Sequence, residues 1–265
     1  MRGWSNPVGN RRGFLRNSNE LFNKIHHNVF WTFLGSFQGI PQDAADRSER
    51  CAWLGDPGFV AEDYMYYFRD IRFWSKWLDD IADTQRPDGS VSYIAPPYWG
   101  EDAFTVWPCW ECAYTLFVWH CYGFYGDTRL LHKHYEGIKR QVEYFKRNAV
   151  ELILEDSLGD HMEPRDALYS SAAPHDTPSN VCGTAYFYYC SSILSRIARV
   201  TGHGQDADEY EALAESIKGA FIETFFDRET CKSQPAVRLQ TRWRSILISS
   251  RTDEEMRSSH ISLTI

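Results

Sequence analysis

The side chains best suited to chemistry are concentrated in one acidic loop, residues 41–58. Pro41, Gly55 and Pro57 deny this stretch a continuous helix, so we expect a shaped loop between helices. Carboxylates held beside an indole suit the cleavage of a glycosidic bond, which takes a proton from a carboxylic acid. A solvated loop of salt bridges is the alternative interpretation. The polar and aromatic side chains concerned are Asp43, Asp46, Arg47, Glu49, Arg50, Trp53 and Asp56.

Helical patterns lie on both sides of the acidic loop. Asn17 and Glu20 stand at capping-box spacing and predict the start of a first helix. After the loop, an apolar stripe with three- and four-residue steps predicts one helix over residues 59–85. Residues 86–100 read as a turn followed by an extended segment that is interrupted by proline. The acidic loop is therefore expected to be mounted between two long helices.

Four further helices are predicted towards the C-terminus. Residues 103–123 are apolar on almost every side, which predicts a buried helix, with Pro108 as an alternative start. The other three begin at N-terminal signals, namely Asp127, Thr177-Pro178 and Asp206. Short Gly-Asp turns join long helices, and longer polar loops fall at the alternate junctions. This alternation predicts an all-α fold, an (α/α)6 toroid of helical hairpins, of which these helices would form about half of the ring.

Composition narrows the classes of partner. The net charge is −8 and no basic patch precedes an aromatic platform, so nucleic acid is not expected as a partner. No run of about 18 apolar residues is present, so no membrane-spanning helix is expected. The first residues lack an apolar signal segment and the seven cysteines are scattered, which indicates reduced thiols and a cytoplasmic location.

The remaining residue spacings give only weak evidence for a metal or cofactor site. Cys109 and Cys112 have the spacing of a redox or zinc pair, but the run around them is apolar and packing is expected. The histidines at 26–27 and 132–134 lack a third partner and are expected on helix surfaces. The acids of residues 156–166 do not follow EF-hand spacing, and no glycine-rich phosphate loop is present. We therefore expect neither a metal nor a cofactor.

The order of residues in the acidic loop is similar to that of a known catalytic loop. Asp43 is followed by Arg47, Glu49 and Arg50, and then by Trp53, Gly55 and Asp56. This order and spacing resemble the loop of the α-L-rhamnosidases of glycoside hydrolase family 78, which reads Asp, Arg-Asp-Glu-Arg and Gly-Trp-x-Gly-Asp. Ser48 stands where aspartate is usual, and Cys51-Ala52 where Leu-Gly is usual. The resemblance extends over residues 14–228.

The resemblance implies an (α/α)6 toroid that removes terminal α-L-rhamnose from a carbohydrate substrate with inversion. It implies Glu49 as the general acid, with Trp53 and Trp99 on either side of the sugar ring. The general base of the family is a glutamate in a Thr-x-Trp-Glu-Arg-Trp segment, and this sequence contains no such segment. The side chains implied to bind the sugar are Asp43, Arg47, Trp53, Asp56, Trp99 and Asp102.

The resemblance also divides the chain. We expect a lead-in over residues 1–16 and a partial six-hairpin catalytic domain over residues 17–230. Residues 231–265 are rich in serine and arginine, which indicates a truncated or frame-shifted end or a disordered tail. Two alternative functions stay open: another toroid glycosidase that acts on glucosides or uronides, and a non-catalytic remnant that binds carbohydrate.

Overall fold

The computed structural model describes residues 16–98, 100, 104, 106–156, 158–159, 177–227 and 232–233. Within that part of the chain the fold is all-α, with one pair of two-residue antiparallel strands, which confirms the predicted fold class. The expected lead-in and tail fall almost wholly outside these residues. The elements in chain order are α1 (Glu20–Ser36), α2 (Gly55–Tyr67), α3 (Ile71–Thr84), α4 (Pro108–Glu111), α5 (Ala113–Tyr125), α6 (Thr128–Asn148), α7 (Ser179–Thr201), α8 (Gly204–Phe225), β1 (Phe226–Asp227) and β2 (Lys232–Ser233).

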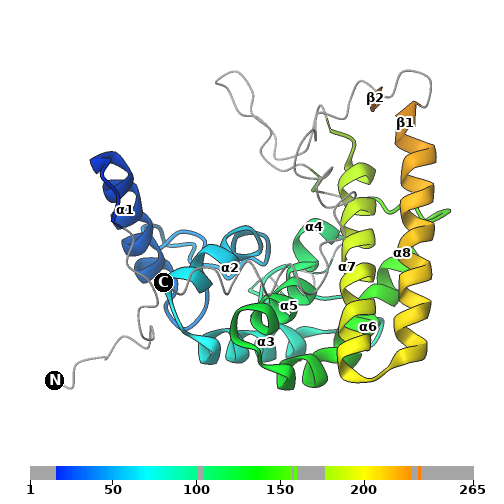
Figure 1. Ribbon diagram of the computed structural model, residues 1–265, viewed down its shortest axis with the longest axis horizontal. Coiled ribbons are helices and arrows are strands. Elements are labelled where there is room, and N and C mark those ends of the chain that lie inside the picture. Colours follow the sequence, from blue (N-terminus) through cyan, green and yellow to red (C-terminus); the bar gives the residue numbers. More distant parts are fainter. Residues whose placement is uncertain are drawn as a thin grey trace.

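The helices run from α1 at one end of the molecule to α8 at the other, and the successive pairs α5–α6 and α7–α8 pack together as hairpins (Figure 1). Two of the turns depend on glycine. Helix α5 ends at Gly126 (φ 68°) and helix α7 ends at Gly202 (φ 86°), both in the left-handed region that side chains with a Cβ rarely adopt. The short turns predicted from the sequence are therefore the points at which the chain reverses.

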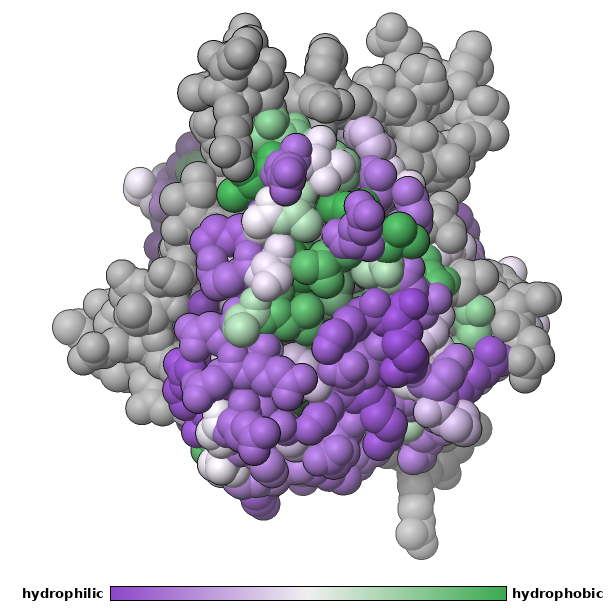
Figure 2. All heavy atoms as spheres, turned by 90° about the vertical axis from the view of Figure 1, so that its right-hand side faces the viewer, coloured by the Kyte–Doolittle hydropathy of each residue, from purple (hydrophilic) through white to green (hydrophobic). Residues whose placement is uncertain are grey.

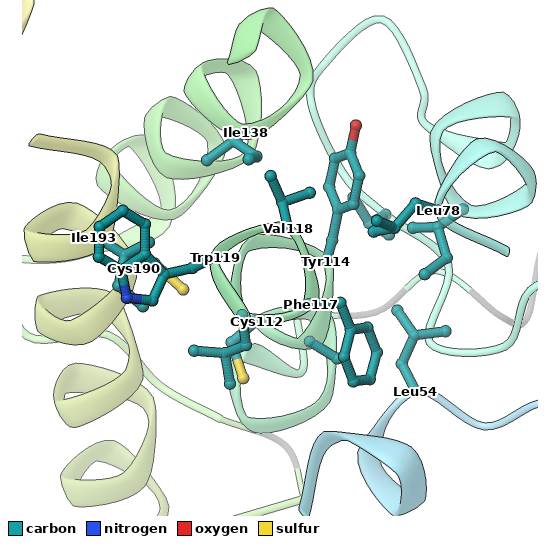
Figure 3. Close-up of a cluster of buried hydrophobic side chains, with 14 of the residues drawn as sticks. Leu54, Leu78, Cys112, Tyr114, Phe117, Val118, Trp119, Ile138, Cys190 and Ile193 are labelled. Carbon is teal, nitrogen blue, oxygen red and sulfur yellow. The ribbon is translucent and has the colours of Figure 1, made fainter. Parts of the chain in front are cut away.

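Helix α5 lies at the centre of the core because it is apolar on every side. It packs against α2, α3, α6 and α7, and most of its residues are buried. Its side chains point to different neighbours: Val118 towards Ile138 of α6, Trp119 towards α7, and Phe117 towards Leu54 beside α2 (Figure 3). The burial predicted for this helix is confirmed.

The single helix predicted over residues 59–85 is wrong. The chain forms two helices there, α2 and α3, separated at Phe68–Asp70. Phe68 has extended backbone angles (φ −131°, ψ 139°) and ends α2. The carboxylate of Asp70 then accepts a hydrogen bond from the backbone N–H of Phe73 (3.3 Å) and caps α3. The apolar stripe continues across the break, and for this reason it concealed the break in the sequence.

Three other helices begin at residues that differ from the predicted ones. The cap of α1 is Asn19, whose side chain accepts from the N–H of Leu21 (2.9 Å), and not Asn17 as expected. The helix expected from residue 103 begins at Pro108, the alternative start, and is interrupted at Cys112. Helix α7 begins at Ser179, after Pro178. Each shift is of a size that terminal signals commonly leave undecided.

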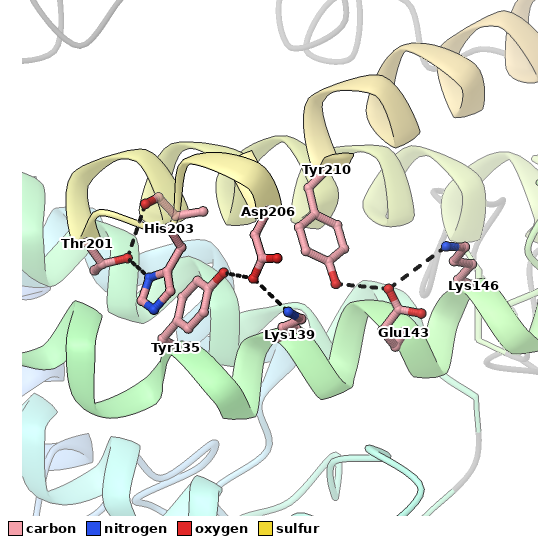
Figure 4. Close-up of polar contacts among 9 residues, drawn as sticks. Tyr135, Lys139, Glu143, Lys146, Thr201, His203, Asp206 and Tyr210 are labelled. Atoms are coloured by element: carbon pink, nitrogen blue, oxygen red, sulfur yellow. Dashed lines mark hydrogen bonds and ion pairs between the residues drawn. The ribbon is translucent and has the colours of Figure 1, made fainter. Parts of the chain in front are cut away.

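Helices α6 and α8 are joined by a row of polar contacts (Figure 4). Asp206 was expected to begin the last helix, but α8 begins at Gly204 and Asp206 lies in its first turn. There its carboxylate accepts hydrogen bonds from the hydroxyl of Tyr135 and from Lys139 Nζ (2.6 Å). One turn further on, Tyr210 donates to Glu143 (2.9 Å). These bonds fix the register of the last hairpin.

We expect Asp206→Ala to lower the free energy of unfolding at pH 7 by about 1 kcal/mol, because two hydrogen-bond donors of α6 lose their acceptor. The bond from Lys139 lowers the pKa of Asp206 below its ordinary value of 3.8. The stabilisation is therefore complete above that value and is lost as the pH falls below it. Urea unfolding at pH 7 and pH 3 measures the difference. Glu215→Gln, on the exposed face of α8, is the control, and an equal loss there would contradict the prediction.

Candidate active site

The acidic loop is closed by a pair of bonds between its two ends. The carboxylate of Asp43 accepts a hydrogen bond from the backbone N–H of Cys51 (2.9 Å). The N–H of Asp43 donates to the carbonyl oxygen of Cys51 (3.0 Å). Arg50 takes a left-handed backbone conformation (φ 47°), which turns the chain between them. Asp43 thus shapes the loop that presents the intervening residues.

Glu49 is held at the surface of this loop between an indole and a guanidinium. Its Oε1 accepts a hydrogen bond from Trp53 Nε1 (3.1 Å), and its Oε2 lies 3.9 Å from a guanidinium nitrogen of Arg47. The Glu49 side chain keeps 37% of its surface exposed. A carboxyl group oriented on one side and open on the other can meet a ligand from solvent.

Trp53 belongs to an aromatic cluster formed by Trp53, Tyr93, Trp107 and Trp110. The indole of Trp53 is parallel to the ring of Tyr93 (5.6 Å between centroids, 7°). Tyr93 stacks in turn on Trp107 (4.1 Å, 25°), and Trp110 meets Trp53 edge to face (5.0 Å). Such pairs add attraction beyond the area that they bury. The cluster backs the loop that carries Glu49.

Backbone pairing fixes the loop to this cluster. The N–H of Leu54 donates to the carbonyl of Tyr93 (2.8 Å), and the N–H of Ala95 donates to that of Ala52 (3.1 Å). Gly55 is required next to them, because a Cβ at this position would lie 2.4 Å from Trp110 Nε1. The end of the acidic loop is therefore pressed against Trp110 without space for a side chain.

A buried carboxyl group lies behind the cluster. Glu111, the last residue of α4, has no exposed surface, and its Oε1 accepts the backbone N–H of Trp107 (3.0 Å). Burial raises its pKa well above the ordinary value, because the apolar surroundings disfavour the charged form. Asp156, also buried, accepts the N–H of Cys109 at the start of α4 (2.8 Å), and burial raises its pKa as well. Both acids thus accept backbone N–H groups at the N-terminal end of this short helix.

A shallow groove of about 730 Å³ opens on the other side of the acidic loop. One wall is the exposed side of α1 and the other is the loop itself. Arg47 belongs both to the groove and to the surroundings of Glu49. The groove is lined by Trp31, Thr32, Gly35, Ser36, Asp43, Ala44, Ala45, Asp46 and Arg47.

The structure brings together part of the site predicted from the sequence. Glu49, Arg47 and Trp53 are in contact. Asp43 bonds to the loop backbone, and Asp56 is exposed in the first turn of α2. Trp99 and Asp102 lie outside the described residues.

Sequence reasoning missed the residues behind the acidic loop. Tyr93, Trp107, Trp110 and Glu111 come from segments far along the chain. An acid within the apolar run of residues 106–119 was the available signal. The packing expected for Cys109 and Cys112 is confirmed, since both cysteines are buried and free.

The described residues contain no group of three or more histidine, cysteine, aspartate or glutamate side chains that could hold a metal ion. None of the helices in the same part of the chain is long and apolar enough to cross a membrane. One histidine contradicts its prediction. His134, expected on a helix surface, is buried and bonds to the hydroxyl of Tyr114 (3.0 Å), and burial lowers its pKa to about 4.

A family model described as the bacterial α-L-rhamnosidase six-hairpin glycosidase domain matches residues 10–256. The chain belongs to this family. The resemblance seen in the acidic loop is thereby confirmed, and the helical hairpins of the structure are those of the six-hairpin toroid. The proteins of this family that match the chain are α-L-rhamnosidases, which are glycoside hydrolases.

Two solved α-L-rhamnosidases and one curated relative illustrate the similarity. The structure from Dictyoglumus thermophilum is 38% identical, with a TM-score of 0.77 over 83% of this chain and 24% of that one. The enzyme from Streptomyces avermitilis, complexed with L-rhamnose, is 28% identical, with a TM-score of 0.74 over 83% of this chain and 20% of that one. An α-L-rhamnosidase of Formosa agariphila is 26% identical over 86% of this chain and 24% of the relative. The chain therefore spans about a quarter of the length of these rhamnosidases.

Proposed function

We propose that this chain carries the proton-donating part of an inverting α-L-rhamnosidase site, which releases terminal α-L-rhamnose from rhamnosides. Glu49 is the general acid, and its carboxyl group protonates the glycosidic oxygen as the bond to the sugar breaks. In an inverting reaction a second carboxylate, about 6.5–9.5 Å away, activates the water that attacks the opposite face of the sugar. The residues assigned here account for the first of these two groups.

The observation that carries the proposal is the placement of Glu49. Its carboxyl group is oriented by Trp53 Nε1 at 3.1 Å, lies 3.9 Å from Arg47 and remains open to solvent. A salt bridge on an exposed loop would need no indole donor and no rigid aromatic support. Both features help a proton donor, because they hold its carboxyl group in one orientation towards the leaving oxygen.

The sugar-binding roles follow from the same loop. Arg47 and Asp56 supply a guanidinium and a carboxylate for the hydroxyl groups of the sugar, and Trp53 supplies a face for its ring. Asp43 contributes chiefly by holding the loop closed through Cys51. Trp99 and Asp102 complete the proposed site on the strength of the family resemblance.

A second candidate function is the binding of carbohydrate without turnover. It applies to residues 1–265 taken alone, which contain no Thr-x-Trp-Glu-Arg-Trp segment and so no counterpart of the family's general base. In that case the acidic loop would still bind rhamnose, but Glu49 would have no partner to activate water.

Titration calorimetry with L-rhamnose and D-glucose tests the sugar class, since the Streptomyces avermitilis relative was solved with L-rhamnose. We expect rhamnose to bind more tightly than glucose. Asp56→Asn should weaken rhamnose binding by roughly 10- to 100-fold, because a hydrogen bond to a charged carboxylate is lost without a change of shape. Asp208→Asn, an exposed aspartate on α8, is the matched control. Equal affinity for the two sugars, or an unchanged affinity in Asp56→Asn, would contradict the assignment.

A further inference from the structure

The carboxyl group of Glu111 is the least expected polar group in the described part of the chain. It is fully buried in an otherwise apolar run, and its Oε2 has no hydrogen-bond partner among the described residues. Within the described part of the chain, its side chain makes one hydrogen bond, which Oε1 accepts from the backbone N–H of Trp107 (3.0 Å). Burying an unpaired polar oxygen destabilises a fold, so the presence of a glutamate at this position needs a structural reason.

The position of Trp107 gives that reason. Its indole nitrogen is buried and has no hydrogen-bond partner among the residues that the structure describes, so packing and the backbone hold the ring there. The ring stacks on Tyr93 at 4.1 Å, and Tyr93 is parallel to Trp53 at 5.6 Å. Trp53 Nε1 in turn donates to Glu49 (3.1 Å). An unbroken series of contacts thus joins the buried acid to the exposed one.

We propose that Glu111 is a positioning residue for the proton donor: by holding the backbone of Trp107, it sets the stack of Trp107, Tyr93 and Trp53 that places the indole N–H against Glu49. The proposal rests on the proposed role of Glu49 as general acid for its catalytic meaning. The contacts themselves do not depend on that role.

Glu111 is also anchored from the side of the core. Its backbone carbonyl accepts a hydrogen bond from Gln141 of α6 (2.7 Å), and Gln141 accepts one from Thr115 of α5 (2.7 Å). The anchor of the stack is therefore fixed to the two central helices and not to the loop. Burial raises the pKa of Glu111 well above its ordinary value, which favours the uncharged form of the anchor.

The test follows the indole N–H of Trp53 in ¹H–¹⁵N spectra between pH 3 and pH 8, with the cross-peak identified by its loss in Trp53→Phe. Its acceptor is Glu49, so its shift should titrate with that carboxyl group. Glu111→Gln keeps a neutral acceptor of the same shape and should leave the peak and its titration unchanged. Glu111→Met removes the acceptor but fits the same space, and it should move the peak and remove most of its pH-dependent shift.

Tyr114→Phe is the control, because it deletes a different buried hydrogen bond, the one to His134, from the same core. An unmoved Trp53 peak in Glu111→Met would overturn the proposal, and so would an equal movement in Tyr114→Phe. If Glu111→Met does not fold, Trp107→Phe tests the other part of the series: it keeps the backbone bond to Glu111 and narrows the stack, and an unmoved Trp53 peak there would also overturn the proposal. Addition of L-rhamnose to the wild type tests the proposed function separately. A Trp53 peak that does not move on this addition would count against the rhamnosidase site, and it would not change the conclusion about Glu111.

Discussion

Replacement of Glu49 by glutamine is expected to lower kcat/KM for an alkyl α-L-rhamnoside by on the order of 100- to 10,000-fold, the usual contribution of a positioned general acid. Glutamine keeps an acceptor for Trp53 Nε1 but has no proton to give to the leaving oxygen. An aryl rhamnoside with an acidic phenol should lose much less, because its leaving group departs without protonation. The ratio of the two losses therefore reports proton donation and not only binding.

The control for this experiment is Glu62→Gln. Glu62 is a half-exposed carboxylate on α2 that lies 3.5 Å from His120 and outside the acidic loop. Both substrates should be cleaved by this variant as by the wild type. If Glu49→Gln lowers kcat/KM equally for the two substrates, Glu49 is not the general acid. Wild type and Glu49→Gln that are equally inert, yet bind rhamnose, would establish the non-catalytic remnant in place of the enzyme.

The part of the site that could be read from the sequence is the part made by local contacts. Glu49, Arg47 and Trp53 lie within a few residues of one another, so their spacing along the chain largely determines their spacing in the loop. The bond between Asp43 and Cys51 is similarly short in sequence. A motif is informative when the chain between its members has little freedom.

The support of the site could not be read in the same way. Tyr93 and Trp107 reach Trp53 through the fold and not through a spacing, and an aromatic residue in an apolar run looks the same whether it packs in a core or backs a catalytic loop. Glu111 carried a signal, an acid without a polar neighbour in sequence, but its partner is a backbone N–H. No side-chain pattern encodes a partner of that kind.

The helix boundaries show a similar division. The start of α6 at Asp127 is predicted correctly, because the side chain of Asp127 accepts the N–H of Arg129 (3.0 Å) and caps the helix within its own first turn. The break between α2 and α3 was missed because the stripe continues across Asp70, whose capping bond is the only local sign of a new start. His134 was misplaced because its partner Tyr114 lies on another helix.

Gly183→Ala is expected to lower the free energy of unfolding by about 3 kcal/mol, the upper range for forced overpacking. Gly183 lies in α7, and a Cβ there would be 2.2 Å from the backbone oxygen of Leu154. A backbone atom cannot rotate away as a flexible side chain does. The segment that would have to move is also bonded to α7 through the N–H of Leu154 and the hydroxyl of Thr184 (3.0 Å).

The displacement should also reach the candidate site, because the same segment carries Asp156, which caps the start of α4 at Cys109 (2.8 Å). Gly219→Ala is the matched control: this glycine is in the middle of α8 and a Cβ there meets nothing within 4 Å. The control should gain about 0.5–1 kcal/mol, since alanine restricts the unfolded chain and favours helix. Urea unfolding gives the free energy of unfolding of both variants and so compares the same change, glycine to alanine, at a crowded and at an open position. If both substitutions raise the free energy of unfolding, then α7 does not approach the backbone at Leu154 as closely as the structure has it. In that case Gly183→Ala would not displace the segment that carries Asp156, and no effect on the aromatic cluster would be expected.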